Sequence, residues 1–320
     1  ILTGVIIGIV ASKKTKTTNT EKIKVTASNF ASYDFLRAII GNNDNVELTF
    51  LLGPGKDAHS YEPTAQDLIT IQNSDLFVYV GGEMEKWADK VLDSLETGKT
   101  EIICIADFVD TMEEKEVDGA EEHEHEDEEN HEEGEEHEEH EHEEGAFDEH
   151  IWTSPENAIK MVNALEKEME KIDSKNSNTY KENANKYIAQ IKDVDSKIQD
   201  VVDHKVRDRL VFADKMPMQY FIDYYKLQVT AAFDGCSTET EPSAKTIAYI
   251  ENKVKEEKIP VILYIELNTG AVAQTIANET GAKAMQIQTL HNVSKTDFDN
   301  GETWVSLMER NIDVLKKALQ

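Results

Sequence analysis

The sequence predicts an α/β fold of two lobes with mostly parallel sheets, linked by one long rigid helix. Three observations predict this fold. Short runs of β-branched residues alternate with amphipathic stretches, this alternation occurs twice, and a long polar helical stretch separates the two occurrences. The length of 320 residues suits two domains of ordinary size, and a hydrophobic content of 39% is enough to build a core in each.

The first alternation covers the first third of the chain. Its strands are expected at residues 22–28, 46–52, 75–80 and 101–106, and an amphipathic stretch follows each of the first three. Thr64 and Asp67 form an acidic variant of the capping box and mark the start of the second helix. The preceding segment GPGKDAHSYEP therefore lies at the carboxyl end of the strand at 46–52.

Two helical stretches, at about 155–171 and 176–203, precede the second alternation. The second stretch is long and polar with a thin apolar stripe, which is typical of a rigid connector between two α/β regions. That stripe consists of Tyr180, Tyr187, Ile191, Val194 and Ile198. Further strands are expected at 209–214, 228–233, 261–266 and 282–288, and helices at 218–225, 242–258, 271–280 and 302–319. We therefore divide the chain into a leader (1–21), a first lobe (22–175), a connecting helix (176–203) and a second lobe (204–320).

The first eleven residues are apolar and uncharged, and a polar Lys/Thr stretch follows them. This length matches the apolar part of an export signal and falls short of the roughly 20 residues that span a bilayer. No cysteine follows it for lipid attachment. We expect the remnant of an export signal or membrane anchor, so the protein is exported to the cell surface or periplasm; a buried N-terminal strand is the alternative.

A histidine-rich acidic segment occupies residues 121–144, within a loop at about 120–147. It contains sixteen carboxylates, six histidines, and no lysine or arginine. The histidines are His123, His125, His131, His137, His140 and His142. Neutral imidazole is the commonest protein ligand for zinc and copper, so this segment is predicted to collect metal ions weakly. The alternative is a solvated acidic tether.

The charge and the cysteines narrow the classes of function. The formal net charge is −31, and it is −15 without the sixteen acids of the loop segment. This excess of acid argues against a nucleic-acid partner and is compatible with cationic ligands. Cys104 and Cys236 have no CxxC spacing, and we expect both to be free and buried, with an inter-lobe disulfide as the alternative.

Three histidines outside the acidic segment follow predicted strands or the segment itself. His59 follows the strand at 46–52, His150 follows the acidic segment, and His291 follows the strand at 282–288. Ligands of open parallel sheets bind beyond the carboxyl ends of the strands, so these imidazoles are expected to meet in the inter-lobe cleft. With an oxygen donor they would make a tetrahedral zinc site. Glu266 is a candidate for that donor or for an acceptor behind a ligand, whereas His204 is expected at the surface.

Four sequence motifs carry a resemblance to a known family. They are DAHSYEPTAQDL (57–68), DEHIWTSPENA (148–158), AFDGCSTETEPS (232–243) and YIELNTGAVAQTIANETGAKAMQIQ (264–288). From about residue 22 the chain resembles the solute-binding proteins of bacterial zinc and manganese ABC importers. The resemblance implies that His59 and His150 are ligands from the first lobe and that the partner is a membrane permease. The histidine-rich insertion favours zinc over manganese.

The chain departs from the family at one ligand position. Ala213, in VFADKMP, stands where a third ligand is expected after the first strand of the second lobe, and alanine cannot coordinate a metal. We expect His291, in TLHNVSK, to supply the bond from this lobe. Asp214, Glu266 or a water molecule is then the fourth donor. A three-histidine site prefers Zn²⁺, because Mn²⁺ favours oxygen ligands.

Other functions remain as alternatives. An enzyme is not expected: the chain has no HExxH motif, and GPGKD (53–57) fails as a P-loop because Phe50 and Asp57 stand at two of its required positions. Binding of manganese or another divalent metal is one alternative. A metal-sequestering or adhesive surface protein without a transporter is the other. We expect a monomer.

Overall fold

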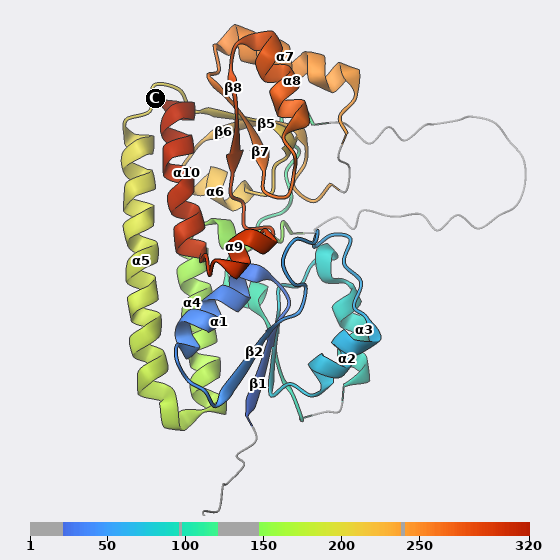
Figure 1. Cartoon of the computed structure of the whole chain (residues 1–320), viewed down its shortest axis with the longest axis vertical. Coiled ribbons are helices and arrows are strands. Elements are labelled where there is room, and N and C mark those ends of the chain that lie inside the picture. Colours follow the sequence, from blue (N-terminus) through green and yellow to red (C-terminus); the bar gives the residue numbers. More distant parts are fainter. Residues whose placement is uncertain (1–21, 96–97, 121–146, 238–240) are drawn as a thin grey trace, which may run out of the picture.

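The computed structural model describes residues 22–95, 98–120, 147–237 and 241–320, and it consists of two α/β lobes stacked end to end (Figure 1). Each lobe contains a four-stranded parallel sheet, in the order β2-β1-β3-β4 and β6-β5-β7-β8. The first sheet comprises β1 (Ile23–Ala27), β2 (Val46–Phe50), β3 (Leu76–Tyr79) and β4 (Glu101–Cys104). The second comprises β5 (Arg209–Lys215), β6 (Gln228–Phe233), β7 (Val261–Ile265) and β8 (Lys283–Ile287). The predicted fold class is confirmed.

Helices connect the strands, as parallel pairing requires. The first lobe contains α1 (Phe30–Ile40), α2 (Ala65–Gln72) and α3 (Trp87–Ser94). The second contains α6 (Gln219–Tyr224), α7 (Ala244–Glu257), α8 (Ala271–Thr280), α9 (Lys295–Asp299) and α10 (Trp304–Leu319). The predicted capping box is present, because the backbone N–H of Thr64 donates to Asp67 Oδ2 at 2.8 Å and that of Asp67 donates to Thr64 Oγ1 at 3.3 Å. The sequence did not predict the short helix α9.

Two long helices, α4 (Pro155–Ile172) and α5 (Ser177–Asp203), follow the first sheet. Helix α5 runs along one side of both lobes, beside α4 and α10, and also contacts α1 (Figure 1). The predicted apolar stripe of α5 is buried against these neighbours. The domain boundaries drawn from the sequence stay a prediction. Within the described residues, no helix is both long and apolar enough to cross a membrane.

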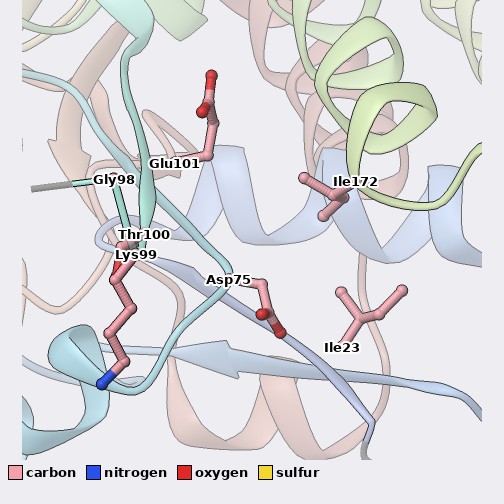
Figure 2. Close-up of a pocket in the computed structure, with 7 residues that line it drawn as sticks. All are labelled: Ile23, Asp75, Gly98, Lys99, Thr100, Glu101 and Ile172. Atoms are coloured by element: carbon pink, nitrogen blue, oxygen red, sulfur yellow. The ribbon is translucent and has the colours of Figure 1, made fainter.

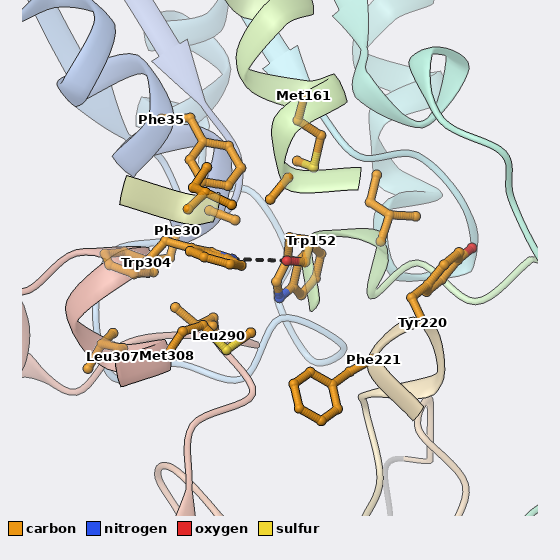
Figure 3. Close-up of a cluster of buried hydrophobic side chains, with 14 of the residues drawn as sticks. Phe30, Phe35, Trp152, Met161, Tyr220, Phe221, Leu290, Trp304, Leu307 and Met308 are labelled. Carbon is orange, nitrogen blue, oxygen red and sulfur yellow. Dashed lines mark hydrogen bonds between the residues drawn. The ribbon is translucent and has the colours of Figure 1, made fainter. Parts of the chain in front are cut away.

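A buried hydrophobic cluster that includes Trp152 and Trp304 joins the two lobes (Figure 3). Trp152 Nε1 donates to the carbonyl of Thr289 at 3.0 Å, and Trp304 Nε1 donates to the carbonyl of Trp152 at 2.9 Å. Trp152 lies two residues after His150, and Thr289 lies two residues before His291. The cluster therefore fixes the relative positions of two predicted ligands from different lobes.

Candidate metal centre

His59 lies in the loop after β2, at the carboxyl edge of the first sheet. Its backbone N–H donates to Asp57 Oδ1 at 2.9 Å, which holds the tight turn that carries the imidazole. His59 Nε2 is buried and has no hydrogen-bond partner. Burial, followed by the positive charges of His150, His291 and Lys215, lowers the pKa of His59 to about 2. The imidazole is therefore neutral at physiological pH, with an unpaired buried nitrogen.

His150 is fully buried just before α4, in the short turn that precedes that helix. Its Nδ1 donates to Asp148 Oδ1 at 3.0 Å, and its backbone N–H donates to the same oxygen at 2.7 Å. Burial lowers the pKa of this imidazole, but the carboxylates of Asp148, Glu149 and Glu114 outweigh burial and raise it above its usual value. A carboxylate behind one ring nitrogen fixes the tautomer and leaves the other, Nε2, free to coordinate a metal.

His291 follows β8 and supplies the imidazole of the second lobe. Its Nδ1 lies 3.2 Å from His150 Nε2, close to the roughly 3.3 Å that separates two nitrogens bound tetrahedrally to one zinc ion. Its Nε2 lies 3.5 Å from Asp57 Oδ1 and 3.4 Å from the backbone nitrogen of Ala58. Nε2 cannot both donate to Asp57 and accept from Ala58. The tautomer with the proton on Nε2 donates to Asp57 and leaves the lone pair of Nδ1 free for a metal. Burial, above all, lowers the pKa of His291 to about 4.

The structure thus brings the three predicted histidines together. Ring centroids are 5.5 Å apart for His59 and His150, 5.0 Å for His59 and His291, and 5.3 Å for His150 and His291. One ligand nitrogen from each ring lies within 4.8 Å of the others. Three imidazoles at this spacing suit a zinc ion, which takes nitrogen ligands at about 2.0 to 2.1 Å.

The two candidate oxygen donors are engaged elsewhere. Glu266 is buried, and its carboxylate accepts hydrogen bonds from the N–H and the hydroxyl of Thr289, both at 2.8 Å. Asp214 accepts from the backbone N–H groups of Lys215 at 2.9 Å and Ile265 at 3.4 Å. Among the described residues, neither carboxylate belongs to a metal-ligand group with the three histidines.

Sequence reasoning missed an ion pair at the edge of the site. Ala213 is buried in the core of the second lobe, but the register of β5 shifts between Phe212 and Lys215, and the Lys215 side chain reaches the first lobe. Its Nζ lies 3.1 Å from Asp57 Oδ2 and its side chain is 6% exposed. Burial raises the pKa of Asp57, but contacts with His291 and Lys215 outweigh it and hold the pKa well below its usual range. Asp57 therefore ties both lobes together beside the imidazoles.

A second group of potential ligands adjoins the first. Glu149, His150 and Cys236 each offer one ligand atom within 4.8 Å of the others. Cys104 and Cys236 are both free, as expected, but the prediction that they are buried is wrong because both are half-buried. His204 is exposed at the end of α5, as predicted. The six histidines of the acidic segment lie outside the described residues.

The first sheet also has a hollow of about 330 Å³ at its opposite edge (Figure 2). Its lining includes Ile23, Asp75 and Glu101, which lie at or just before the amino ends of β1, β3 and β4. The histidines instead follow the carboxyl ends of strands. The hollow shares no residue with the three-histidine group.

Together, the fold and the histidine cluster define the class as a two-lobed binding protein in which potential metal ligands from both lobes meet. Residues 25–318 match the ZnuA family, described as "Zinc-uptake complex component A periplasmic". The chain belongs to this family.

Two curated relatives cover almost all of this chain. It is 33% identical over 300 residues to the "High-affinity zinc uptake system protein ZnuA" of Bacillus subtilis, covering 93% of this chain and 88% of the relative. It is 31% identical over 301 residues to the "Zinc-binding lipoprotein AdcA" of Streptococcus pneumoniae, covering 93% of this chain but only 56% of that longer protein. The crystal structure of the Zn(II)-bound ZnuA-like domain of the same AdcA superposes with a TM-score of 0.74 at 26% identity, covering 93% of this chain and 99% of that domain.

Proposed function

We propose that this protein is the extracytoplasmic zinc-binding component of an ABC importer. It binds one Zn²⁺ between its lobes through His59, His150 and His291 and delivers the ion to a membrane permease. The observation that carries the proposal is the convergence of three imidazoles from both lobes, one of them with an unpaired buried nitrogen. The names of the relatives, a zinc-uptake protein and a zinc-binding lipoprotein, support zinc as the cargo.

The donor set favours zinc over manganese because all three protein ligands are nitrogens. The carboxylates of Glu266 and Asp214 are already occupied by N–H and hydroxyl donors. We therefore favour a water molecule as the fourth ligand. Asp148 and Asp57 would orient His150 and His291 from behind.

Release of the zinc ion to a permease requires the bonds between the ion and the ligands of the two lobes to break. The site takes two ligands from the first lobe and one from the second, so any separation of the lobes breaks a zinc bond. We propose that the protein works as an exported monomer, held at the membrane or free in the periplasm. Membership of the family and the distribution of the three histidines between the lobes support this mode of action.

Zinc affinity measured by competition with a chelator tests the site. His59→Ala should bind zinc at least tenfold more weakly than the parent, because a direct bond is lost. An unchanged affinity would refute the assignment. Zinc uptake in a strain lacking the gene tests transport: uptake restored by the parent but not by His59→Ala supports an importer. Growth in scarce zinc that does not depend on the protein would instead favour a sequestering or adhesive role.

We further propose that the acidic segment at 121–144 gathers zinc for the tight site. The chain returns from it at Phe147, three residues before His150. Its charge raises the local cation concentration, and closing a loose segment around a metal costs chain entropy, so each site there is weak. Deleting 121–144 should leave one tight zinc per chain in titration calorimetry, remove the weaker sites, and slow uptake only when zinc is scarce. Loss of the tight site in this deletion would contradict the division of roles.

A further inference from the structure

The two lobes place potential ligands at corresponding positions. Their strand orders are identical, so β2 corresponds to β6 and β4 to β8. His59 follows β2 and Cys236 follows β6; His150 lies in the connection after β4 and His291 follows β8. The three-histidine group uses three of these four positions. Cys236, at the fourth position, has no part in it.

Cys236 instead faces a carboxylate from the first lobe. Its Sγ donates to Glu149 Oε2 at 3.0 Å, and its backbone N–H donates to Glu114 Oε1 at 3.1 Å. The other oxygen of Glu149 accepts from the backbone N–H of Met84 at 3.0 Å. Glu149 also packs so closely on Gly82 that any side chain there would collide with it. Glu149 is 1% exposed and His150 is fully buried, so both groups are held in place.

The chemistry of this group suits a borderline or soft divalent cation. A thiolate, a carboxylate and an imidazole are ligands that zinc, cadmium and cobalt accept, whereas magnesium and calcium take oxygen donors. The three ligand atoms lie within 4.8 Å of one another. Binding would release the thiol proton to solvent as the sulfur–metal bond forms, so no oxidant or other reactant is needed.

We propose that Glu149, His150 and Cys236 form a second position for the transported ion, alternative to the three-histidine site. The two positions share His150, whose Nδ1 is held by Asp148, so its one remaining nitrogen binds one ion at a time. An ion moves between them by exchanging Glu149 and Cys236 for His59 and His291 while His150 stays bound. This inference rests on the proposed zinc-binding function.

The second position lies close to described residues that flank the acidic segment in the sequence. The backbones of Glu113 and Phe147 pair in an isolated antiparallel bridge, and Asp148 N donates to the carbonyl of Met112 at 2.9 Å. Glu114 and Glu149 are the neighbours of these paired residues in the sequence. The described chain on either side of the acidic segment therefore leads directly to Glu114 and Glu149 of the Cys236 group.

Cobalt(II) is a suitable probe, because cobalt bound to a thiolate absorbs in the near ultraviolet and cobalt bound only by imidazole and oxygen does not. With one equivalent of Co²⁺, the parent should lack the sulfur band, since the ion takes the three-histidine site. His59→Ala should develop the band, because the ion then occupies the Cys236 position. The half-buried loop position of His59 makes this variant fold like the parent, which its thermal unfolding checks.

The two cysteines provide a matched control. His59→Ala with Cys236→Ser should lose the band and bind Co²⁺ at least tenfold more weakly than His59→Ala with Cys104→Ser, which should keep it. Cys104 donates instead to the carbonyl of Val80 at 3.2 Å. No band in saturated His59→Ala, or a band that survives Cys236→Ser, would overturn the proposal. A band in the parent at one equivalent would also overturn it, by placing the sulfur in the tight site.

This experiment separates the two proposals. If His59→Ala retains the zinc affinity of the parent in chelator competition, the three-histidine site fails. The sulfur band of cobalt in His59→Ala, and its loss when Cys236→Ser is added, then test the second position separately.

Discussion

The two lobes share one strand order but present different chemistry at the cleft. In each sheet, the potential metal ligands follow the edge strands: His59 and His150 after β2 and β4, Cys236 and His291 after β6 and β8. The same scaffold position thus holds an imidazole in one lobe and a thiol in the other. The difference separates Cys236 from the three histidines that we propose as the tight site.

The inner strands of both lobes carry supporting groups instead of ligands. Glu85 follows β3 and accepts from the backbone N–H groups of Val80 and Gly81, at 2.5 and 3.0 Å. Glu266 follows β7 and accepts from Thr289 in the loop that leads to His291. Lys215 ends β5 and pairs with Asp57 of the other lobe. The candidate ligands therefore follow edge strands, and three inner strands, β3, β5 and β7, lead to groups that support the surrounding loops.

The largest effect should come from His150, which belongs to both ligand groups. His150→Ala should weaken zinc binding by more than about 100-fold, beyond the loss typical of residues that only support a ligand. His59→Ala should lose less, because the Cys236 position remains available. Chelator competition on both variants measures the difference. Equal losses of zinc affinity in the two variants would mean that the Cys236 group does not bind zinc when His59 is missing.

The second-largest effect on zinc affinity should come from His291, the ligand that we propose from the second lobe. His291→Ala should weaken zinc binding by about 10- to 100-fold or more, since a direct bond is removed. Asp214→Asn serves as the matched control, because Asp214 accepts hydrogen bonds from the backbone N–H groups of Lys215 and Ile265 and its loss should leave zinc affinity near that of the parent. Parent-like binding by His291→Ala together with weak binding by Asp214→Asn would reverse the assignment.

The smallest effect concerns the supporting carboxylate of the first lobe. Burial raises the pKa of Glu85 from 4.5 to about 6, although the nearby hydroxyl of Ser28 and the hydrogen bonds from the backbone N–H groups of Gly81 and Val80 oppose the shift. Because the Glu85 carboxyl holds its proton more tightly in the folded state than in the unfolded state, the shift stabilises the fold below pH 4.5. This stabilisation is lost as pH rises through 6. The loss is about 2 kcal/mol.

The side chain of the Glu85→Gln variant cannot ionise, so the variant should not lose this stability as the pH rises. Urea unfolding of parent and variant at pH 4.5 and pH 7 measures it: the difference between the two proteins should shift by about 2 kcal/mol in favour of the variant at pH 7. A difference that does not change with pH would mean that Glu85 titrates normally.

Much of this architecture follows from patterns within the sequence. Alternating runs predict every strand, and β6 has the predicted limits of 228 and 233. The proximity of His59, His150 and His291 could be predicted because parallel strands bring their carboxyl ends to one edge. The five-residue helix α9 is too short to produce a periodic signal.

The supporting groups could not be predicted, because they depend on contacts between lobes. Lys215 reaches the cleft through a register shift in β5, which the apolar run RLVFAD does not reveal. Cys236 has no second cysteine nearby in the sequence, and its partner Glu149 is 87 residues away in the other lobe. Asp57 is separated from Lys215 by 158 residues. Only the packing of the two lobes brings these side chains together.

The central claim is that edge-strand loops from both lobes meet at a single zinc ion. A crystal structure of the zinc-loaded protein, with anomalous data at the zinc absorption edge, tests it directly. The account predicts one strong anomalous peak about 2.0 to 2.1 Å from a nitrogen of each of His59, His150 and His291. A principal peak bound by Asp214 or Glu266 without His291, or held by one lobe alone, would contradict it.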